Sequence, residues 1–585
     1  MTRFAPAVAA ALVAAGAAFV VGLLWGTFAA GGSDSSCYLN QARLFASGTT
    51  RIEQPLVLSA PWPRAEFTFT PAGHVPSRAA RDAIVPMCPP GLPLLMAAAR
   101  IVRLGEFIVV PLLGALAVWL TFVLGRRFES PAAGATSAVL FACSPIFLYQ
   151  VVQPMTDVPA AACWLLAIVL AIPDEGTQRS QRAGSASSAW NGVPRALAAG
   201  LATGIAILTR PNLLPLASLI AIYLARLKPS PYIRPSTDCR SAKALAERSA
   251  RLKGSPYNSA AKRLAWYIAG IAPGVIVLAI LQWRMYGSPL ATGYGAPGDL
   301  FRATNVVPNL ARYPRWLLET HTPVLALALA APFVLRRRAD AWLCLTVAIA
   351  TIAAYLPYQV FNDWWYIRFL LPAVPLLIVL TVAIVHRALN RGDRREFTGV
   401  TASSTSAAPG TSPMPRTSTI AGISAASAVS AVFVFTLGGW WIHVARERRA
   451  FQLRDLERPY VDAGMFVAER LTANTAFLTV KDSGAVQYYA QRPTVLWDML
   501  PSHSLDRALD FLRAQGLRPL LLVDTTEEPE FRARFSAASA IGALDWPPIA
   551  RVGRTVRVYD PADRARYLAG ATIQTIDVWP VHPRR

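Results

Sequence analysis

The sequence predicts a polytopic α-helical membrane protein of about eleven spans, with a large first outer loop and an extracytoplasmic α/β domain at the C-terminal end. The first observation behind this prediction is composition: the 585 residues are 54% hydrophobic and only 16% charged, whereas soluble domains carry about a quarter charged residues. The second is a succession of apolar runs close to span length. The third is a change to soluble character from about Arg446 onward.

The first expected span runs from Phe4 to Phe28. It follows Arg3 and resembles a signal peptide, but it reaches the roughly 20 residues of a true span, so we expect it to stay uncleaved. Residues 91–103 are apolar but too short to cross, which predicts a helix lying at the outer face. The remaining expected spans are 104–125, 131–149, 158–173, 196–209, 212–225, 264–281, 321–335, 341–358, 368–387 and 418–442.

Basic residues set the expected orientation. The formal net charge is +23, and much of it falls in alternate loops between apolar runs, as the positive-inside rule predicts for cytoplasmic loops. The bilayer therefore explains the basic excess, and we do not expect nucleic acid as a partner. The N-terminus is expected in the cytoplasm and residues 443–585 outside it. The membrane domain is expected to comprise residues 1–442, with the first outer loop at 31–90 and cytoplasmic loops at 226–263 and 390–417.

The soluble C-terminal domain is predicted from short apolar runs that alternate with helical patterns. Strands are expected at 476–480, 494–497, 519–523 and 555–559, and helices at 503–515 and 527–536. The tyrosines of segment 486–493 are expected to pack against a strand. Loops 176–194 and 396–417 are rich in Ser, Thr, Ala, Gly and Pro, which is typical of flexible linkers.

Two carboxylates are the candidate catalytic residues. Asp34 emerges where the first apolar run ends, ahead of an amphipathic helix that Gly48 terminates, and that helix is suited to the membrane interface. Asp157 lies at the outer end of the loop between the third and fourth spans. Each could equally be a helix cap. Their predicted position on the same membrane face favours function.

Three arginines at outer span ends are the candidate ligands for an anionic substrate group. Arg210 lies at the tip of a hairpin with short arms, so its guanidinium is expected below the surface, where it needs an anion or a counter-ion. A lipid phosphate or an internal salt bridge, for instance with Asp157, would satisfy it. Arg284 and Arg368 occupy similar positions. Tyr38 is a further substrate-binding candidate, and Trp365 fits a substrate wall or an interfacial aromatic belt equally well.

The six cysteines and six histidines indicate neither a disulfide framework nor a zinc site. Cys37 and Cys88 flank the same outer loop, so they either pair across it or remain free thiols. No cofactor is indicated. A divalent metal is compatible with the carboxylates but is not indicated by them.

Five segments resemble membrane glycosyltransferases of the GT-C fold, in particular the bacterial relatives of the protein O-mannosyltransferases and of the lipid A aminoarabinose transferase (glycosyltransferase family 39-like). The resemblance runs over most of residues 1–390. The segments that carry it are Asp34-Ser-Ser-Cys-Tyr-Leu-Asn-Gln-Ala-Arg, Pro89-Pro-Gly-Leu-Pro-Leu, Gln153-Pro-Met-Thr-Asp-Val-Pro-Ala, Leu208-Thr-Arg-Pro-Asn and Trp364-Trp-Tyr-Ile-Arg-Phe-Leu-Leu-Pro.

The resemblance implies transfer of a hexose or pentose from a polyprenyl-phosphate donor to a hydroxyl of a protein, lipid or glycan acceptor, with inversion, outside a bacterial cytoplasmic membrane. The family's first-loop acid falls on Asp34, and the acid of its next outer loop falls on Asp157. Members often carry a second acid beside the first, whereas Ser35 and Ser36 stand here, which weakens the case for a metal.

Two other functions fit parts of the pattern. A lipid-handling or transport protein would bind the same lipids, but it usually carries charged groups near mid-span, and most of the predicted spans here lack them. A scaffold that keeps the fold without activity is the other alternative, since the second acid beside Asp34 is missing. A sugar-transfer assay separates these alternatives.

Overall fold

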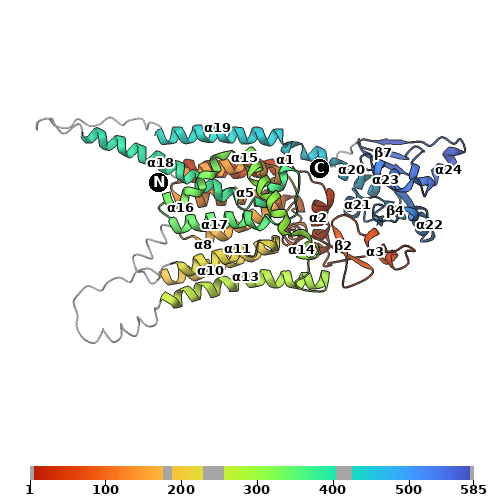
Figure 1. Ribbon diagram of the computed structural model, residues 1–585, viewed down its shortest axis with the longest axis horizontal. Coiled ribbons are helices and arrows are strands. Elements are labelled where there is room, and N and C mark those ends of the chain that lie inside the picture. Colours follow the sequence, from red (N-terminus) through yellow and green to blue (C-terminus); the bar gives the residue numbers. More distant parts are fainter. Residues whose placement is uncertain (1–4, 175–186, 228–255, 403–424, 580–585) are drawn as a thin grey trace, which may run out of the picture.

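The computed structural model describes residues 5–174, 187–227, 256–402 and 425–579. A long bundle of helices carries a C-terminal α/β unit at one end, with α2 (Gly32–Ala46) and the rest of the 31–90 loop between them (Figure 1). We call this end of the bundle the domain-facing end. The expected loops 226–263 and 390–417 and the linkers 176–194 and 396–417 lie for most of their length outside the described residues.

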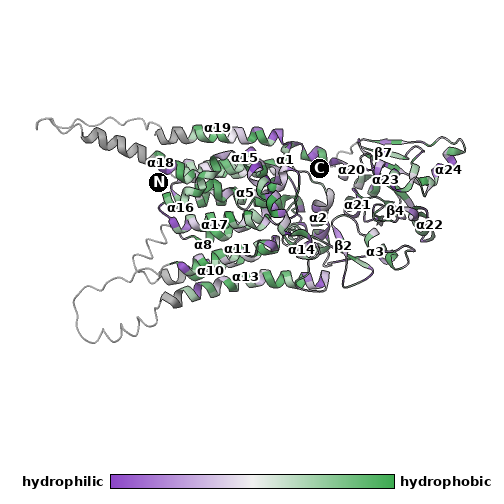
Figure 2. Ribbon diagram, in the orientation of Figure 1, coloured by the Kyte–Doolittle hydropathy of each residue, from purple (hydrophilic) through white to green (hydrophobic). Residues whose placement is uncertain are grey.

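Helices occur in every one of the expected apolar segments, and the helix expected at 91–103 is α4 (Gly91–Ile101). Hydrophobic residues dominate the bundle and polar ones gather toward the C-terminal unit (Figure 2). The bundle elements are α1 (Ala5–Leu24), α5 (Val109–Phe128), α6 (Pro131–Cys143), α7 (Pro145–Val151), α8 (Asp157–Ala171), α10 (Ser187–Thr209), α11 (Leu216–Arg226), α13 (Pro256–Tyr286), α15 (Val306–His321), η5 (Pro323–Ala330), α16 (Ala331–Val334), α17 (Arg338–Tyr355), α18 (Val374–Ala402) and α19 (Ala425–Glu447).

The chain is a multi-pass membrane protein, but several helices are shorter or more bent than simple spans. By length and apolar composition, four helices of the described ranges can cross a membrane, or seven segments if each of three bent helix pairs is one span. Four further apolar helices have 10–17 residues. Short and broken helices are tolerated where neighbouring helices bury the freed backbone groups.

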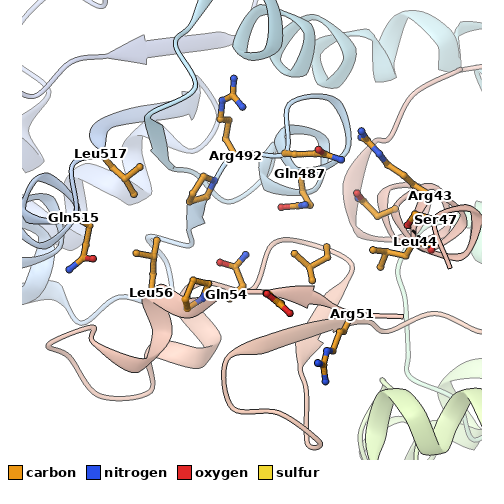
Figure 3. A pocket seen from close by; sticks show the side chains of 16 residues that line it. Arg43, Leu44, Ser47, Arg51, Gln54, Leu56, Gln487, Arg492, Gln515 and Leu517 are labelled. Atoms are coloured by element: carbon orange, nitrogen blue, oxygen red, sulfur yellow. Dashed lines mark hydrogen bonds between the residues drawn. The ribbon is translucent and has the colours of Figure 1, made fainter. Parts of the chain in front are cut away.

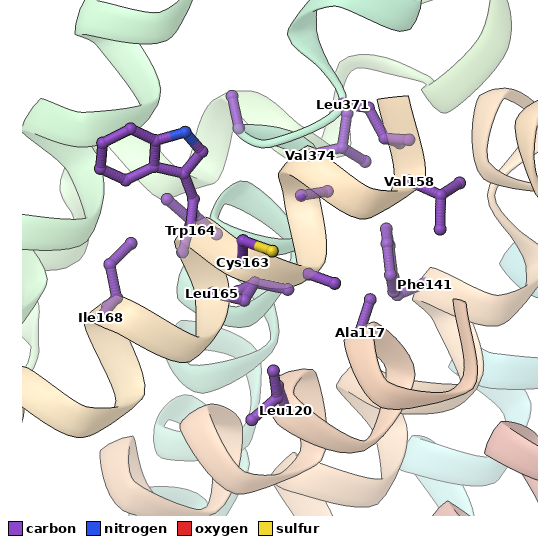
Figure 4. Close-up of a cluster of buried hydrophobic side chains, with 14 of the residues drawn as sticks. Ala117, Leu120, Phe141, Val158, Cys163, Trp164, Leu165, Ile168, Leu371 and Val374 are labelled. Atoms are coloured by element: carbon purple, nitrogen blue, oxygen red, sulfur yellow. The ribbon is translucent and has the colours of Figure 1, made fainter. Parts of the chain in front are cut away.

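The bundle core is a continuous cluster of buried side chains. Trp164 of α8 is 1% exposed and belongs to the same buried cluster as residues of α5, α6 and the start of α18 (Figure 4). Lipid tails are as apolar as these side chains, so close packing rather than the hydrophobic effect holds such helices together. Shape complementarity therefore decides which helices pair.

Helices α10 and α13 pair through glycines spaced four residues apart on each helix. A Cβ added at Gly200 would lie 2.2 Å from the Tyr267 carbonyl oxygen, and one at Gly270 would lie 2.4 Å from the Leu197 carbonyl oxygen. Gly204 and Gly274 meet in the same way one turn further along. Only glycine permits this backbone approach, which is the small-residue packing of membrane helices.

We expect Gly270→Val to destabilise the protein by about 3 kcal/mol, the upper end of overpacking effects, because the added side chain must push two backbones apart. Thermal unfolding of the purified protein in detergent measures this effect. Gly16→Val in α1 is the matched control, since nothing lies within 4 Å of a Cβ built there. Equal melting temperatures for the two variants would contradict the tight contact.

The 31–90 loop is folded rather than open. Helix α2 (Gly32–Ala46) is the amphipathic helix expected after Asp34, and its residues Ser35 to Ala42 are buried by packing. A small antiparallel sheet follows in the order β1-β3-β2, built from β1 (Ile52–Glu53), β2 (His74–Pro76) and β3 (Ala83–Pro86), with α3 (Ala65–Thr68) beside it. A disulfide joins Cys37 to Cys88, with 6.1 Å between the Cα atoms, so α2 is tied to the chain that enters α4.

The C-terminal α/β unit (residues 453–578) is built on a six-stranded sheet of order β5-β4-β6-β8-β7-β9. β4 runs parallel to β5 and β6, and β8 runs antiparallel to β6 and β7. The strands expected from sequence correspond to β4, β5, β6 and β8, and the expected helices to α22 and α23. The elements are α20 (Leu453–Arg470), β4 (Thr475–Leu478), α21 (Ser483–Tyr489), β5 (Thr494–Val495), α22 (Leu505–Ala514), β6 (Arg518–Asp524), α23 (Glu528–Phe535), β7 (Ala550–Val552), β8 (Val556–Tyr559), α24 (Asp563–Leu568) and β9 (Ile576–Val578).

Helix α21 corrects the expectation that the tyrosines of segment 486–493 pack on a strand. The Tyr488 hydroxyl donates to Glu106 beside the start of α5, and the Tyr489 hydroxyl donates to the Phe28 carbonyl at the end of the first span. The two side chains dock the C-terminal unit onto the bundle. A short helix rich in aromatic residues resembles a strand when only its sequence is considered, because aromatic residues have high β-propensity. That propensity reflects side-chain packing more than an intrinsic backbone preference.

Asp482, just before α21, makes the stability of this unit depend on pH. Its side chain is 1% exposed, and its Oδ2 has no hydrogen-bond partner among the described residues. Burial, with the nearby carboxylates of Glu527 and Asp524, raises the pKa of Asp482 to about 8. Between about pH 4, where the unfolded chain releases this proton, and about pH 8, the folded state retains it, so stability falls as pH rises.

We expect Asp482→Asn to remove this slope, which amounts to at most about 1.4 kcal/mol per pH unit. The variant should melt above the wild type at pH 8 and near it at pH 5, in thermal unfolding of the full-length protein between pH 5 and 9. Asp510→Asn is the control, since that side chain is 73% exposed. Parallel pH profiles for wild type and Asp482→Asn would show that Asp482 is not the titrating group.

Candidate active site at the domain-facing end of the bundle

The first pair of candidate residues is joined directly. Asp34 lies in the first turn of α2, and its Oδ2 accepts a hydrogen bond from Arg368 Nη2 at 2.6 Å. Arg368 belongs to a 3₁₀ segment, η6 (Trp364–Leu370), that leads into α18. The Asp34 side chain is 35% exposed and Arg368 is 13% exposed. Asp34 is therefore not the cap of α2: its carboxylate faces a guanidinium and remains open to solvent.

The second pair is buried. Asp157, the first residue of α8, forms an ion pair with Arg210, and their side chains are 2% and 8% exposed. Arg210 also donates to the Tyr355 hydroxyl at 3.1 Å and to Thr156 Oγ1 at 3.5 Å. All three guanidinium nitrogens are thus engaged. Of the two partners considered for Arg210, the internal salt bridge with Asp157 is the one that the structure contains.

One aromatic ring connects the two pairs. The guanidinium of Arg368 lies 5.1 Å from the centroid of the Phe369 ring, and that of Arg210 lies 5.5 Å from it. Cations are attracted to an aromatic face, more strongly where water is excluded. A hydrogen bond of 3.1 Å between the hydroxyls of Tyr38 and Thr156 links α2 to the buried pair. Asp34, Asp157, Arg210, Arg368 and Tyr38 therefore converge on one site.

Arg368 keeps donors that no protein group uses well. Its Nη1 donates only to the Met155 thioether at 2.8 Å, and its buried Nε has no partner among the described residues. Thioether sulfur is a weak acceptor, and an unsatisfied buried donor is costly. A phosphate oxygen would satisfy these donors, because a guanidinium fork matches phosphate geometry. Arg368 is therefore better placed than Arg210 to bind an incoming anion.

Local sequence explains how these side chains reach one place. Pro211 ends α10 directly after Arg210, so the guanidinium emerges at the helix end. A Cβ at Gly91 would lie 2.5 Å from the Thr209 backbone nitrogen, so α4 packs against the end of α10 just before Arg210. Asp157 opens α8 with Pro159 in the first turn, where proline is tolerated.

The structure leaves two sequence candidates outside the group. Arg284 of α13 is exposed, and no contact joins it to the site within the described ranges. Its neighbours Met285 and Tyr286 are buried instead, so the helix turns Arg284 outward. Trp365 stacks on Tyr149, with ring centroids 6.1 Å apart, and this contact fits an aromatic belt as well as a substrate wall.

Several site residues were not singled out from the sequence. Thr156 directly precedes Asp157 in the chain, and Phe369 directly follows Arg368. Their position next to the candidate residues is the sequence signal that could have identified them. Tyr355 and Tyr294 come from segments without such a signal. Burial, together with the nearby charges of Tyr38 and Asp34, raises the pKa of the Tyr294 phenol well above its usual value.

The described residues do not fit a divalent metal site. No group of three or more His, Cys, Asp or Glu side chains is arranged to hold an ion within the parts of the chain that the structure describes. Asp34 and Asp157 each face an arginine.

We expect Arg210→Ala to reduce the amount of folded protein sharply, because it leaves the Asp157 carboxylate buried without a partner, a change that costs about 3–5 kcal/mol. The double variant Asp157→Asn/Arg210→Gln removes both charges and should recover most of that stability. Monodisperse yield and melting temperature in detergent measure both effects. If Arg210→Ala were as stable as the double variant, the ion pair would not be the structural support described here.

Comparisons with known proteins found one family-model match and several similar folds. Residues 89–238 match the family model for the N-terminal part of the oligosaccharyl transferase STT3, a range that includes Asp157 and Arg210 but not Asp34 or Arg368. No curated protein matches the chain in sequence. The structure of ArnT from Cupriavidus metallidurans bound to undecaprenyl phosphate is similar, with a TM-score of 0.52, 14% identity, and coverage of 93% of this chain and 97% of that one.

The apo structure of the same ArnT gives a TM-score of 0.51 with 13% identity, and again 93% and 97% of the two chains are covered. An Archaeoglobus fulgidus oligosaccharyltransferase with a tethered acceptor peptide gives 0.45 with 14% identity over 92% and 72% of the chains. The resemblance to GT-C membrane glycosyltransferases that the sequence indicated is confirmed at the level of the fold.

Proposed function

We propose that this protein is a membrane glycosyltransferase that moves a hexose or pentose from a polyprenyl-phosphate donor to a hydroxyl of a protein, lipid or glycan acceptor. In this proposal the reaction takes place outside the bacterial cytoplasmic membrane, with the N-terminus in the cytoplasm. Residues 1–442 form the membrane domain that contains the reaction centre. Residues 443–585 form the extracytoplasmic domain that covers it.

The observation that carries the proposal is the state of Arg368. A mostly buried guanidinium with unfilled donors lies beside a partly exposed carboxylate. That arrangement offers an anion site next to a base that an acceptor can reach. The similar ArnT fold was solved with undecaprenyl phosphate bound, which supports a lipid phosphate as the anion.

The proposed reaction is a direct displacement. The Asp34 carboxylate accepts the proton of the acceptor hydroxyl as its oxygen attacks the anomeric carbon. The bond between that carbon and the phosphate oxygen breaks, and the polyprenyl phosphate leaves with the electron pair. Arg368 stabilises the charge that develops on the phosphate. Attack opposite the leaving group inverts the anomeric centre.

Asp157 and Arg210 act as positioning residues in this proposal. Asp157 is 2% exposed and committed to Arg210, so an acceptor does not reach it. Arg210 shares the Phe369 ring with Arg368 and holds Thr156, which in turn holds Tyr38. The buried Asp157–Arg210 pair therefore holds in place the side chains next to Arg368 and Asp34.

Sugar transfer in isolated membranes tests the proposal. Membranes that contain the protein are supplied in turn with radiolabelled polyprenyl-phosphate sugars, hexoses and pentoses, and the label entering lipid, protein and glycan fractions is counted against membranes without the protein. We expect protein-dependent incorporation from one of these donors. Equal incorporation in both membranes, with the protein present and folded, would favour a lipid-handling protein or a scaffold.

A further inference from the structure

A large pocket lies away from the carboxylate–arginine site, between the 31–90 loop and the C-terminal α/β unit. Its volume is about 780 Å³, within the range of ligand sites in proteins. The second half of α2 and residues 51–56 form one wall, and residues around the end of α21 and the α22–β6 connection form the other (Figure 3).

The pocket is on the far side of α2 from Asp34. Arg43 lines the pocket nine residues after Asp34, which is about 2.5 helical turns, so the two side chains leave the helix in opposite directions. Asn40, Leu44 and Ser47 share the face of Arg43. A ligand in this pocket therefore does not occupy the proposed reaction centre.

The lining carries an excess of positive charge. Three arginines, Arg43, Arg51 and Arg492, are among the lining residues, whereas Glu53 is the one carboxylate in the lining. Arg43 is held by the Tyr488 carbonyl oxygen. Arg51 and Arg492 form no ion pair within the described ranges. Arg492 Nη1 donates to the Ala490 carbonyl oxygen at 3.2 Å, and Arg492 Nε has no partner there. Guanidinium groups without counter-ions at a pocket rim favour a ligand that carries anionic groups such as carboxylates or phosphates.

The uncharged polar residues of the lining are mostly amides. Gln54, Gln487 and Gln515 line the pocket together with further amides and aliphatic side chains. An amide offers both donors and acceptors, which suits the hydroxyls of a sugar, while Leu44 and Leu517 suit the apolar faces of its rings. Arginines, amides and leucines in one pocket fit an acidic sugar chain better than a neutral one.

We propose that this pocket is a second ligand site that binds an anionic oligosaccharide of a few sugar units. Under the proposed function, such a ligand is part of the acceptor glycan, held apart from the hydroxyl that reacts. Binding itself does not require transfer, so a direct binding measurement separates failure of this proposal from failure of the proposed activity.

The test is binding of fluorescently labelled tetragalacturonate to the full-length protein in phosphatidylcholine nanodiscs, followed by anisotropy. Labelled maltotetraose is the neutral probe of equal length, and labelled hexaglutamate is the acidic peptide probe. We expect tetragalacturonate to bind at least tenfold more tightly than either. Arg51→Gln/Arg492→Gln should weaken it at least tenfold, whereas Arg554→Gln, an exposed arginine of the same unit outside the pocket, and Asp34→Asn should not.

Arg51→Gln is measured alone as well, because Arg51 is exposed and its substitution leaves the fold unchanged. Absence of tetragalacturonate binding to the wild type would overturn the proposal. Hexaglutamate binding of equal strength, or an equal loss in Arg554→Gln, would also overturn it by showing general charge attraction.

Discussion

Asp34→Asn is expected to reduce sugar transfer roughly 100- to 10,000-fold, the range that a general base contributes. The asparagine amide keeps the size of the side chain but does not accept the proton of the acceptor hydroxyl. Asp34 is 35% exposed, and the asparagine amide oxygen can still accept a hydrogen bond from Arg368, so the fold should tolerate the change. The loss should therefore appear in kcat rather than in donor binding.

The measurement is the initial rate of label transfer at matched protein levels in membranes. Asp363→Asn is the control, because Asp363 is an exposed acid just before η6 and loses the same charge at the same end of the bundle. Comparable rates for Asp34→Asn and Asp363→Asn would show that Asp34 is not the base.

Arg368→Ala is expected to lower transfer roughly 100- to 1,000-fold, the effect of removing one group that stabilises developing charge. Its partner Asp34 is partly exposed, so the substitution does not leave a buried charge, in contrast to Arg210→Ala. Arg368→Lys keeps the charge but not the paired donors, and we expect it to recover only part of the rate.

Binding separates the role of Arg368 from that of Asp34. Retention of labelled undecaprenyl phosphate by the purified protein should fall at least tenfold in Arg368→Ala and stay near the wild-type level in Asp34→Asn. Arg284→Ala is the matched control, since that arginine is exposed on α13. Undiminished binding and transfer in Arg368→Ala would remove Arg368 from the reaction centre.

The helical positions and the acids at one end of the bundle could be predicted from sequence because apolar runs and isolated charges are local signals. Which of these helices and side chains contact one another in the fold could not be predicted. Asp34 and Arg368 are 334 residues apart in the chain. The hydropathy of an apolar segment also does not indicate which other helix it packs against. Arg284 and Arg368 look alike in sequence, and only the rotation of α13 turns the former outward. The number of full crossings stays a prediction, because four helices of the described ranges are long and apolar enough to cross, three bent pairs raise this to seven, and four further apolar helices are shorter.

The pocket beside α2 shows the same limit. Its arginines and glutamines come from two segments more than 400 residues apart in the chain. No local sequence pattern marks any of these residues as part of a ligand site. The disulfide between Cys37 and Cys88 was one of two alternatives in the sequence. Spatial adjacency decided it.

The most direct test of the central claim is the position of the lipid phosphate in a cryo-electron microscopy structure of the full-length protein with undecaprenyl phosphate in nanodiscs. We predict phosphate oxygens within hydrogen-bond distance of Arg368 Nε and Nη1, in place of the Met155 contact, with the Asp34 carboxylate on the same side of the phosphate as the sugar and the acceptor hydroxyl of the proposed reaction. A phosphate bound elsewhere on the protein, with the Asp34–Arg368 pair unchanged, would contradict the claim.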